Sequence, residues 1–552
     1  MTPETLADAV RACLLEAVAA GDLAVDVPAA VTVERPRNRD HGDWATNVAL
    51  QLAKAAGRPP REVAELLAGR LRAFPGVEGV DVAGPGFLNV RLDTASAGAL
   101  ARDVVEAGPA YGRNTTLAGE VVNLEFVSAN PTGPLHIGHT RWAALGDSLA
   151  RLLRAAGASV TTEFYVNDAG AQMDRFGASV LARAAGRPVP EGGYRGGYVD
   201  GLAQKVLAER PDLLELPEDE AVPVARDTAY RLQMAEVEQT LVDFDVHFDV
   251  FFSERELHNT DAVAVAVERL RAQGHVDDTD GAVWLRTTDF GDDKDRVLVR
   301  ANGEPTYFAS DAAYYLSKKD RGFPRKIYLL GADHHGYVKR LQAIAACAGD
   351  DPAVSIEVLI GQLVDIGGAR MSKRAGNIVE LRDLVEWIGR DSVRYSLARY
   401  PADSPLSLDA EEMRRQTNDN PVFYVQYAHA RTCNVARNAA TAGVRREDGF
   451  DAALLDDDSE EVVLAVLAQF PGVVAQAATL REPHRVARYL EELAGSYHKW
   501  YDQRRVAPSV AKDGTVEPVG DVHRSRLWLN DAVRTVLANG LALLGVGAPE
   551  RM

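Results

Sequence analysis

Cysteine is scarce in this chain of 552 residues, and its three copies stand far apart at Cys13, Cys347 and Cys433. No C-x-x-C pair occurs, so neither a disulfide framework nor a structural zinc site is expected. The sequence also lacks an apolar run long enough to cross a membrane, and its N-terminus lacks the basic start and apolar core of a signal peptide. We therefore expect a cytoplasmic protein with reduced, buried thiols and no membrane association.

Positive charge is in deficit as well, because 61 Lys and Arg stand against 80 Asp and Glu, for a formal net charge of -19. This balance counts against a nucleic-acid ligand, whose phosphates repel negative charge. Arginines nevertheless cluster locally, as at Arg414 and Arg415 and at Arg504 and Arg505. A nucleic acid would meet only one face of the protein, but composition alone favours a solvated surface for each cluster.

The stretch from Val121 to Gly157 predicts a strand, a tight loop and a helix. Residues 121–127 are an apolar run typical of a buried parallel strand, and the loop 128–134 contains two prolines and a glycine. The following helix begins at His136-Ile137-Gly138-His139. Free N–H groups at a helix N-terminus favour anions, and two imidazoles add donors, so the pattern outlines an ATP site. The alternative for the tetrapeptide alone is a helix start with two solvated histidines.

This pattern resembles the HIGH signature of class I aminoacyl-tRNA synthetases, and residues 125–136 resemble its arginyl-tRNA synthetase version. A second segment, Arg370-Met371-Ser372-Lys373-Arg374, resembles the KMSKS loop of the same class. Lys373 carries over as the phosphate-binding lysine, whereas Arg370 replaces the family's first lysine. Segments 165–170, 248–254, 306–311 and 331–337 also resemble bacterial arginyl-tRNA synthetases, so the resemblance covers nearly the whole chain.

Three domains are expected along the chain. Residues 1–108 mix helical patterns with a strand-like run and predict a small α+β domain. Residues 115–400 alternate apolar runs with helical stretches, which predicts an α/β domain with a parallel sheet and an insertion at about 185–275. Residues 410–552 show only helical spacing. The resemblance implies a Rossmann-like nucleotide-binding fold for the second domain, contact with the tRNA elbow for the first, and anticodon binding for the third.

An arginine site needs carboxylates, because a guanidinium is a planar, permanently protonated fork of donors. Glu125 and Asp311 are the expected pair, and Tyr307, four residues before Asp311 on a predicted helix, can cover the fork. A structural ion pair is the alternative for either carboxylate alone. The resemblance also assigns arginine binding to Ser128, Asn130, Asp333 and His334, near the substrate's α-amino group.

The resemblance further implies ATP with Mg²⁺ as a substrate and no protein-bound metal. The residues expected to bind ATP are Pro134, His136, Gly138, His139, Met371, Ser372 and Lys373. Of these, His136, His139 and Lys373 are the expected catalytic residues, since preorganised donors stabilise phosphate charge in transit. The residues expected to contact tRNA are Phe87, Asn89, Tyr427, Tyr497 and Tyr501. Aromatic core at helical spacing is the alternative for some of these rings.

The predicted activity is ATP-dependent formation of arginyl-adenylate from L-arginine, followed by transfer of the arginyl group to the 3'-terminal adenosine of tRNA(Arg), by a monomer. Two alternatives remain. Other nucleotidyltransferases share a HIGH-type helix but lack a long helical C-terminal domain. A non-catalytic RNA-binding paralogue would lose the ATP residues, which this chain keeps at His136, His139 and Lys373.

Overall fold

The computed structural model describes the chain from Met1 to Met552, apart from residues 37, 363, 368–378, 511–512 and 514. The side chains at 39, 333–335 and 366 also lie outside the described residues. Short 3₁₀ turns are η1 (Arg39–His41), η2 (Gly108–Ala110), η3 (Leu213–Glu215), η4 (Thr287–Phe290), η5 (Ala332–Tyr337), η6 (Arg446–Asp448) and η7 (Ala452–Leu454).

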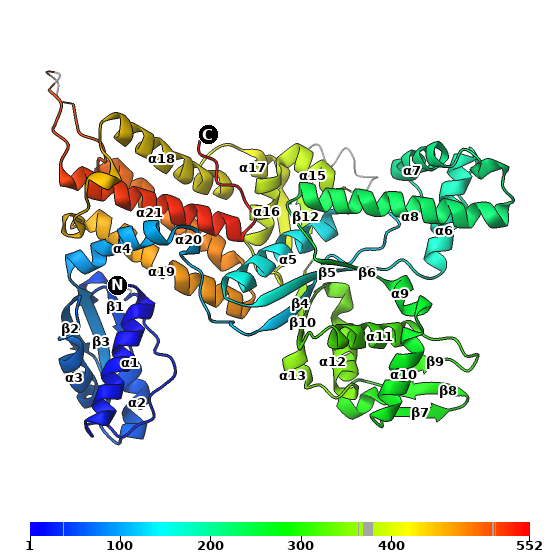
Figure 1. Cartoon of the computed structure of the whole chain (residues 1–552), viewed down its shortest axis with the longest axis horizontal. Coiled ribbons are helices and arrows are strands. Elements are labelled where there is room, and N and C mark those ends of the chain that lie inside the picture. The colour runs from blue at the N-terminus through cyan, green and yellow to red at the C-terminus, as the bar shows by residue number, and fades with distance from the viewer. Residues whose placement is uncertain (37, 363, 368–378, 511–512, 514) are drawn as a thin grey trace.

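The N-terminal part folds as a small α+β unit, as predicted (Figure 1). Its elements are α1 (Pro3–Ala19), β1 (Trp44–Thr46), α2 (Val48–Ala56), α3 (Pro60–Leu71), β2 (Val77–Ala83) and β3 (Phe87–Leu92). The three strands form an antiparallel sheet in the order β1-β3-β2. The next helix, α4 (Thr94–Ala107), packs instead on the C-terminal helix α21 (Asp521–Leu543). The boundary predicted at residue 108 therefore follows a helix that packs with the C-terminal part of the chain.

The central part contains a five-stranded parallel sheet in the order β11-β10-β4-β5-β6. Its strands are β4 (Val121–Glu125), β5 (Ser159–Val166), β6 (Val250–Ser253), β10 (Arg325–Gly331) and β11 (Ile356–Gly361). Alternate residues enter two cores, since Ile327 and Leu329 join one and Tyr328 joins the other. The chain leaves β4 toward β5 on one side and reaches β10 on the other. The carboxyl ends of β4 and β10 thus form the switch point where open α/β sheets bind ligands.

The helices of the central part cover both faces of this sheet. They are α5 (Ile137–Ala155), α9 (Glu254–Asn259), α10 (Ala262–Ala272), α11 (Tyr307–Asp320), α12 (Val338–Cys347), α13 (Pro352–Ser355), α15 (Leu381–Ile388) and α16 (Arg390–Ala398). Gly146 lets α5 approach the sheet closely, because a Cβ there would lie 2.3 Å from the Phe126 ring.

The predicted insertion is helical and extends from the sheet as α6 (Ala171–Ala184), α7 (Gly197–Glu209) and α8 (Glu218–Asp243), which share their own core (Figure 1). Its bounds differ from the predicted 185–275, because β6 at 250–253 pairs with β5 as an edge strand of the main sheet. A small antiparallel sheet follows, formed by β7 (Val276–Thr279), β8 (Ala282–Leu285) and β9 (Arg296–Val299). No sequence pattern had indicated it, since each of its strands is only four residues long.

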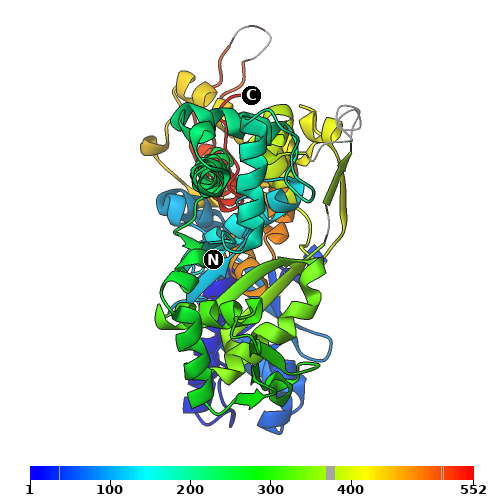
Figure 2. The ribbon, with the colours of Figure 1, turned by 90° about the vertical axis from the view of Figure 1, so that its right-hand side faces the viewer.

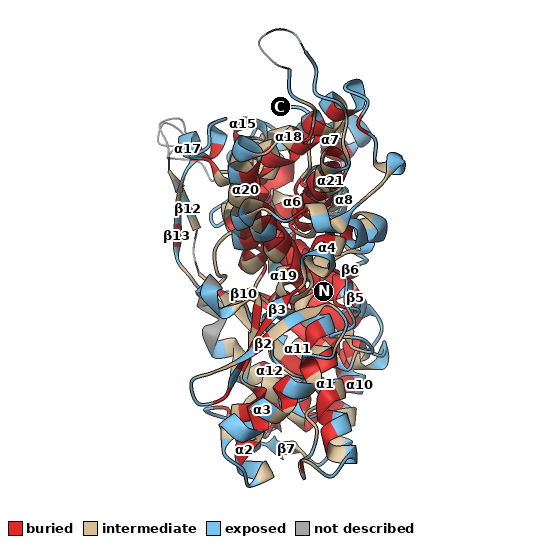
Figure 3. Cartoon of the chain, turned by 90° about the vertical axis from the view of Figure 1, so that its left-hand side faces the viewer, coloured by how far each residue is buried: buried red, intermediate tan, exposed pale blue. Residues whose placement is uncertain are grey.

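The C-terminal part is helical, as predicted, with α17 (Ala410–Arg414), α18 (Pro421–Thr441), α19 (Asp458–Leu480), α20 (His484–Gln503) and α21. Figure 3 shows buried residues concentrated where these helices pack. Among the described residues, α19 is the one helix long and apolar enough to cross a membrane, and half of its apolar window is buried in the protein. Two strands, β12 (Val364–Gly367) and β13 (Leu406–Asp409), pair in parallel as a narrow ribbon at the flank (Figures 2 and 3).

Candidate active site

A cavity of about 750 Å³ opens at the carboxyl ends of β4 and β10. The predicted residues that line it are Glu125, Ser128, His136, Gly138, His139, Tyr307 and Asp311. The fold thus brings the predicted ATP residues and the predicted arginine residues to one place. Asn130 and Pro134 lie on the loop between β4 and α5, where Asn130 is exposed and Pro134 borders a separate small crevice.

The loop after β4 carries two non-glycine residues in the left-handed region, Val127 at φ 68° and Ser128 at φ 42°. Such backbone costs about 1–3 kcal/mol per residue and persists only where its surroundings hold it. The Ser128 hydroxyl donates to Glu125 at 3.1 Å and accepts from the Tyr165 N–H at 3.2 Å. These bonds fix the sharp turn that directs the chain from β4 toward the start of α5.

The two histidines of the first signature are neutral donors. His136 caps α5, and its Nδ1 accepts from the Gly138 N–H at 3.2 Å, while Nδ1 of His139 accepts from the His136 N–H at 3.3 Å. A ring nitrogen that accepts in this way leaves its hydrogen on Nε2. Burial lowers the pKa of both rings, and with His136 beside it the pKa of His139 falls to about 3. Each Nε2–H is therefore free to bind a phosphate oxygen without carrying a charge.

Glu125 does not stand free in the cavity. Nζ of Lys318, a fully buried residue of α11, lies 2.5 Å from Oε2 of Glu125. The Tyr314 hydroxyl stands between two carboxylates, 2.9 Å from Glu125 and 2.5 Å from Glu163. The neighbouring strand presents Glu163, which Arg321 binds with two nitrogens. Glu125 thus forms the structural ion pair that was the alternative for this carboxylate. A substrate guanidinium would have to compete with Lys318 for the Glu125 carboxylate.

Asp311 and Glu254 are the carboxylates that face the cavity without a lysine or arginine partner within 4 Å among the described residues. Burial raises the pKa of Asp311 to about 7, against a hydrogen bond from the Tyr337 hydroxyl. Burial also raises the pKa of Glu254, which Tyr165 and His258 contact. Two carboxyl groups of raised pKa in one pocket are well suited to receive a cationic ligand.

Glu254 is not among the residues predicted for the site, although it belongs to the segment 248–254 that resembles the family. The available signal was a carboxylate directly after a short strand, since the carboxyl ends of parallel strands meet at one edge of the sheet. β6 was assigned to the insertion, so its end was not placed at the site.

The second signature lies outside the described residues. Arg370, Met371, Ser372 and Lys373 are outside the described residues, as are the side chains of Asp333 and His334. The chain on the far side of this segment returns to α5, because the Ile137 N–H donates to the Val379 carbonyl at 3.1 Å and the Leu381 N–H donates to Leu135 at 2.8 Å. The residues that follow the second signature are therefore hydrogen-bonded beside the helix N-terminus.

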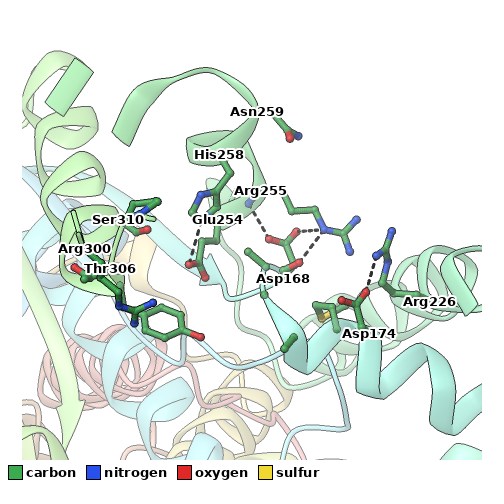
Figure 4. Close-up of a pocket in the computed structure, with 16 residues that line it drawn as sticks. Asp168, Asp174, Arg226, Glu254, Arg255, His258, Asn259, Arg300, Thr306 and Ser310 are labelled. Atoms are coloured by element: carbon green, nitrogen blue, oxygen red, sulfur yellow. Dashed lines mark hydrogen bonds and ion pairs between the residues drawn. The ribbon is translucent and has the colours of Figure 1, made fainter. Parts of the chain in front are cut away.

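A second cavity of about 670 Å³ shares Glu254 and Tyr307 with the first (Figure 4). Tyr307 is 74% exposed and stands between the two spaces. The cations on the wall of the second cavity include Arg226, Arg255 and Arg300. Within the described part of the chain, no group of three or more His, Cys, Asp or Glu could hold a metal ion.

The residues predicted to contact tRNA differ in accessibility. Phe87 on β3 is 40% exposed, whereas Asn89 is largely buried. Tyr427 and Tyr501 flank Arg431, whose guanidinium carbon lies 4.7 and 4.6 Å from their ring centroids. Tyr497 is fully buried and its hydroxyl donates to Asn530 at 2.8 Å. Its ring belongs to the core, so direct contact with a nucleotide is closed to it in this structure.

Comparison with known families matches three models in chain order. They are the arginyl tRNA synthetase N terminal domain at residues 4–92, the class I (R) tRNA synthetase catalytic domain at 104–183 and 216–416, and the DALR anticodon binding domain at 425–552. The catalytic model is interrupted between 183 and 216, where α7 lies.

Similar proteins include the arginine--tRNA ligases of Micrococcus luteus, 66% identical, and Paenarthrobacter aurescens, 65% identical, each over 100% of both chains. The crystal structure of the Thermus thermophilus arginyl-tRNA synthetase superposes with a TM-score of 0.76 at 24% identity, over 100% of both chains, and so supports the fold. Because both the family models and the close relatives span the chain, this protein belongs to the arginyl-tRNA synthetase family of class I aminoacyl-tRNA synthetases.

Proposed function

We propose that this protein is an arginine--tRNA ligase. It activates L-arginine with Mg-ATP and transfers the arginyl group to the 3'-terminal adenosine of tRNA(Arg). The observation that supports this most directly is a single cavity. It is lined both by Asp311 and Glu254, which pair with no lysine or arginine within 4 Å among the described residues, and by the neutral histidine donors at the N-terminus of α5. Family membership supplies the reaction class, and these carboxyl groups supply the selectivity.

Arginine binds with its guanidinium between Asp311 and Glu254. Its fork of N–H donors can bond two carboxylates at once, and the exposed ring of Tyr307 covers it. Glu254, and not Glu125 as predicted from the sequence, is the second carboxylate that binds the guanidinium, because Lys318 already neutralises Glu125. The backbone end of the substrate extends toward Ser128 and Asn130, with Asp333 and His334 as further candidates. Lysine is rejected because its ammonium cannot make the parallel paired bonds.

ATP binds at the start of α5. The helix N-terminus and the Nε2–H groups of His136 and His139 hold phosphate oxygens, with Pro134 and Gly138 beside them. Since both histidines are neutral, the positive charge comes from Lys373, with Met371 and Ser372 on the same loop. Mg²⁺ enters as part of the ATP substrate.

The chemistry needs no side-chain nucleophile. A carboxylate oxygen of arginine attacks the α-phosphorus, the bond to the bridging oxygen breaks, and pyrophosphate leaves. The 2'-hydroxyl of the terminal adenosine then attacks the carbonyl carbon of the adenylate, and AMP leaves with the electron pair of the broken C–O bond. Preorganised donors at the phosphates stabilise charge in the first step.

The 3' end of the tRNA reaches the adenylate through the second cavity. Its wall carries Arg300, and also Arg226 and Arg255, which pair with Asp174 and Asp168 (Figure 4). These cations suit a phosphate backbone, and Tyr307 and Glu254 are common to this cavity and the proposed arginine pocket. The exposed Phe87 contacts the tRNA elbow, and the Tyr427–Arg431–Tyr501 stack receives anticodon bases. We infer that the enzyme acts as a cytoplasmic monomer.

The test is a charging assay of the purified protein with total tRNA, ATP and each labelled amino acid in turn. Only arginine should become acid-precipitable, and AMP release should depend on tRNA. Adenylyl transfer to a small molecule without tRNA would instead support a nucleotidyltransferase. Tight tRNA binding without any AMP release would support the RNA-binding paralogue.

A further inference from the structure

The first turns of α5 contain a buried guanidinium that the proposed reaction does not use. Arg141 is 1% exposed and lines the same cavity as His136 and His139. Its Nη1 donates to the carbonyls of Gln362 at 2.8 Å and Ser404 at 3.0 Å, and its Nη2 donates to Pro401 at 2.8 Å. All the acceptors are backbone oxygens from segments far from α5 in the sequence.

Within the described residues, Arg141 forms no ion pair with a carboxylate within 4 Å, its hydrogen bonds all go to carbonyls, and its Nε has no hydrogen-bond partner. Burial lowers the pKa of this guanidinium, and the exposed Asp403 opposes that effect only at a distance. A buried cation without a counter-ion is costly and is retained where it serves a purpose. Since Arg141 shares a cavity with the proposed phosphate donors, a bound triphosphate would supply the missing negative charge.

The carbonyls that Arg141 binds lie at the base of the β12–β13 ribbon. The first paired residues of this parallel ribbon are Val364 and Leu406, and Gln362 and Ser404 each stand two positions earlier. The Gln362 N–H also donates to the Ala402 carbonyl at 3.0 Å. One guanidinium therefore joins the starts of both ribbon strands to α5.

This ribbon is the element that leads into the second signature. The chain passes from β12 through residues 368–378 and returns to α5 at the Ile137–Val379 hydrogen bond. Arg141 therefore binds the chain before residues 368–378, and the Ile137–Val379 hydrogen bond joins the chain after them to the start of α5. Figures 2 and 3 show that the ribbon runs along the flank of the molecule.

We propose that Arg141 is a positioning residue for adenylate formation. It holds the base of the β12–β13 ribbon against α5, the helix at whose N-terminus the triphosphate is proposed to bind, and its charge favours that anion. The proposal rests on the proposed ATP chemistry. It separates ATP handling from arginine recognition, because Asp311 and Glu254 belong to α11 and α9 and contact neither Arg141 nor the ribbon.

Lysine cannot replace this residue. Three carbonyls in different directions match the planar fork of a guanidinium, whereas an ammonium is a compact charge on a single stem. Arg141→Lys keeps the charge and loses the three-way contact, and Arg141→Met loses both. Arg151 is the control on the same helix. It also donates to backbone carbonyls, those of Asp245 and Ala542, but it pairs with the carboxylates of Asp147 and Asp245 and lies outside the cavity.

The experiment measures three quantities for Arg141→Lys, Arg141→Met and Arg151→Met in the full-length protein. They are single-turnover adenylate formation against ATP concentration with tRNA present, arginine affinity by calorimetry, and hydrogen exchange of residues 364–367 and 406–409. Arg141→Lys should form adenylate about tenfold to a hundredfold more slowly, as small misplacements of reacting groups do. It should also require more ATP for half-saturation and exchange faster in the ribbon, with unchanged arginine affinity. Arg151→Met should keep the wild-type ATP dependence and ribbon exchange.

The proposal is overturned if Arg141→Lys keeps the wild-type rate and ribbon exchange, or if arginine affinity and adenylate formation fall together. Should Arg141→Met fail to fold, Arg141→Lys still decides. If the wild-type protein formed no adenylate, the proposed function would fail, while ribbon exchange would still report whether Arg141 holds the ribbon.

Discussion

At the scale of single residues, the raised pKa of Asp311 makes arginine binding depend on pH. The folded protein retains a proton on Asp311 up to about pH 7, mainly because of burial, while the unfolded chain loses it near 3.8. The contribution of Asp311 to stability without ligand is thus greatest below pH 4 and is lost as pH rises through 7. A guanidinium needs the ionised form. Arginine affinity should therefore rise by up to about tenfold per pH unit below 7 and level off above it.

Calorimetry of arginine binding in buffers of different ionisation enthalpy checks this prediction, since binding near pH 7 should release a proton. Asp311→Asn should lose that proton release along with much of the affinity. An arginine affinity constant between pH 6 and 8, with no proton released, would contradict the assignment of Asp311 to the guanidinium.

Two glutamates on the wall of the same cavity should behave differently when neutralised. Glu254→Gln should lower kcat/KM for arginine by about tenfold to a hundredfold with little change in stability, because a charge-assisted bond is worth roughly 1.5–3 kcal/mol. Glu125→Gln should instead lower the free energy of unfolding by about 3–5 kcal/mol, since it leaves the buried Lys318 with only the more distant Glu163, at 4.0 Å, as a carboxylate partner. Urea unfolding and steady-state charging of both variants provide the comparison. The reverse pattern would return Glu125 to the substrate site.

Loss of a phosphate donor should slow adenylate formation rather than weaken arginine binding. His136→Ala and Lys373→Ala should each reduce the single-turnover rate by about a hundredfold to a thousandfold, with the KM for arginine little changed. Because burial lowers the pKa of both histidines, their titration should not appear in the pH profile of this step above pH 6.5. A raised KM for arginine at a wild-type rate would show that these groups act elsewhere.

At the scale of one element, α20 carries a core tyrosine, Tyr497, and one turn later a surface tyrosine, Tyr501. Tyr501→Ala should weaken tRNA binding by about 1–3 kcal/mol, the usual value of a stacked base, with stability unchanged. Tyr497→Ala should cost about 3–5 kcal/mol of stability, because its ring fills the core and its hydroxyl binds Asn530. Thermal unfolding and filter binding of tRNA distinguish the two. If both substitutions lowered tRNA affinity equally and neither changed stability, the assignment of Tyr497 to the core and Tyr501 to the tRNA surface would be wrong.

At the scale of the whole molecule, tRNA binding should be salt-sensitive despite the net charge of -19. Several phosphate contacts release counter-ions, so the logarithm of affinity should fall linearly with the logarithm of salt concentration. Deleting residues 1–92 should reduce that slope and weaken charging, while leaving α4 on α21. Deleting 1–108 also removes α4 and should destabilise the C-terminal helices. Filter binding across salt concentrations, with thermal unfolding of both deletions, gives the measurement, and salt-independent binding would contradict it.

Local patterns of the sequence were sufficient for much of this molecule. A buried strand, a proline-containing loop and an apolar helix stripe place His136 and His139 at a helix N-terminus wherever the rest of the chain lies. A separation of four residues on a helix places Tyr307 and Asp311 on one side, and both line the cavity. The parallel sheet and the helical C-terminal part follow from alternation and spacing in the same way. These features depend on interactions between residues close in the sequence, so the sequence by itself determined them.

Which side chains pair with one another, and which are buried, was decided only by the tertiary structure. Lys318 stands 193 residues after Glu125, and nothing local indicates that their side chains meet. Glu254 entered the cavity because β6 joined the main sheet, and Tyr497 was buried because α21 packs against its side of α20. A carboxylate or an aromatic ring has the same sequence signature whether it faces a ligand or a neighbouring helix. The difference lies in the desolvation and pairing that distant segments impose once they pack together.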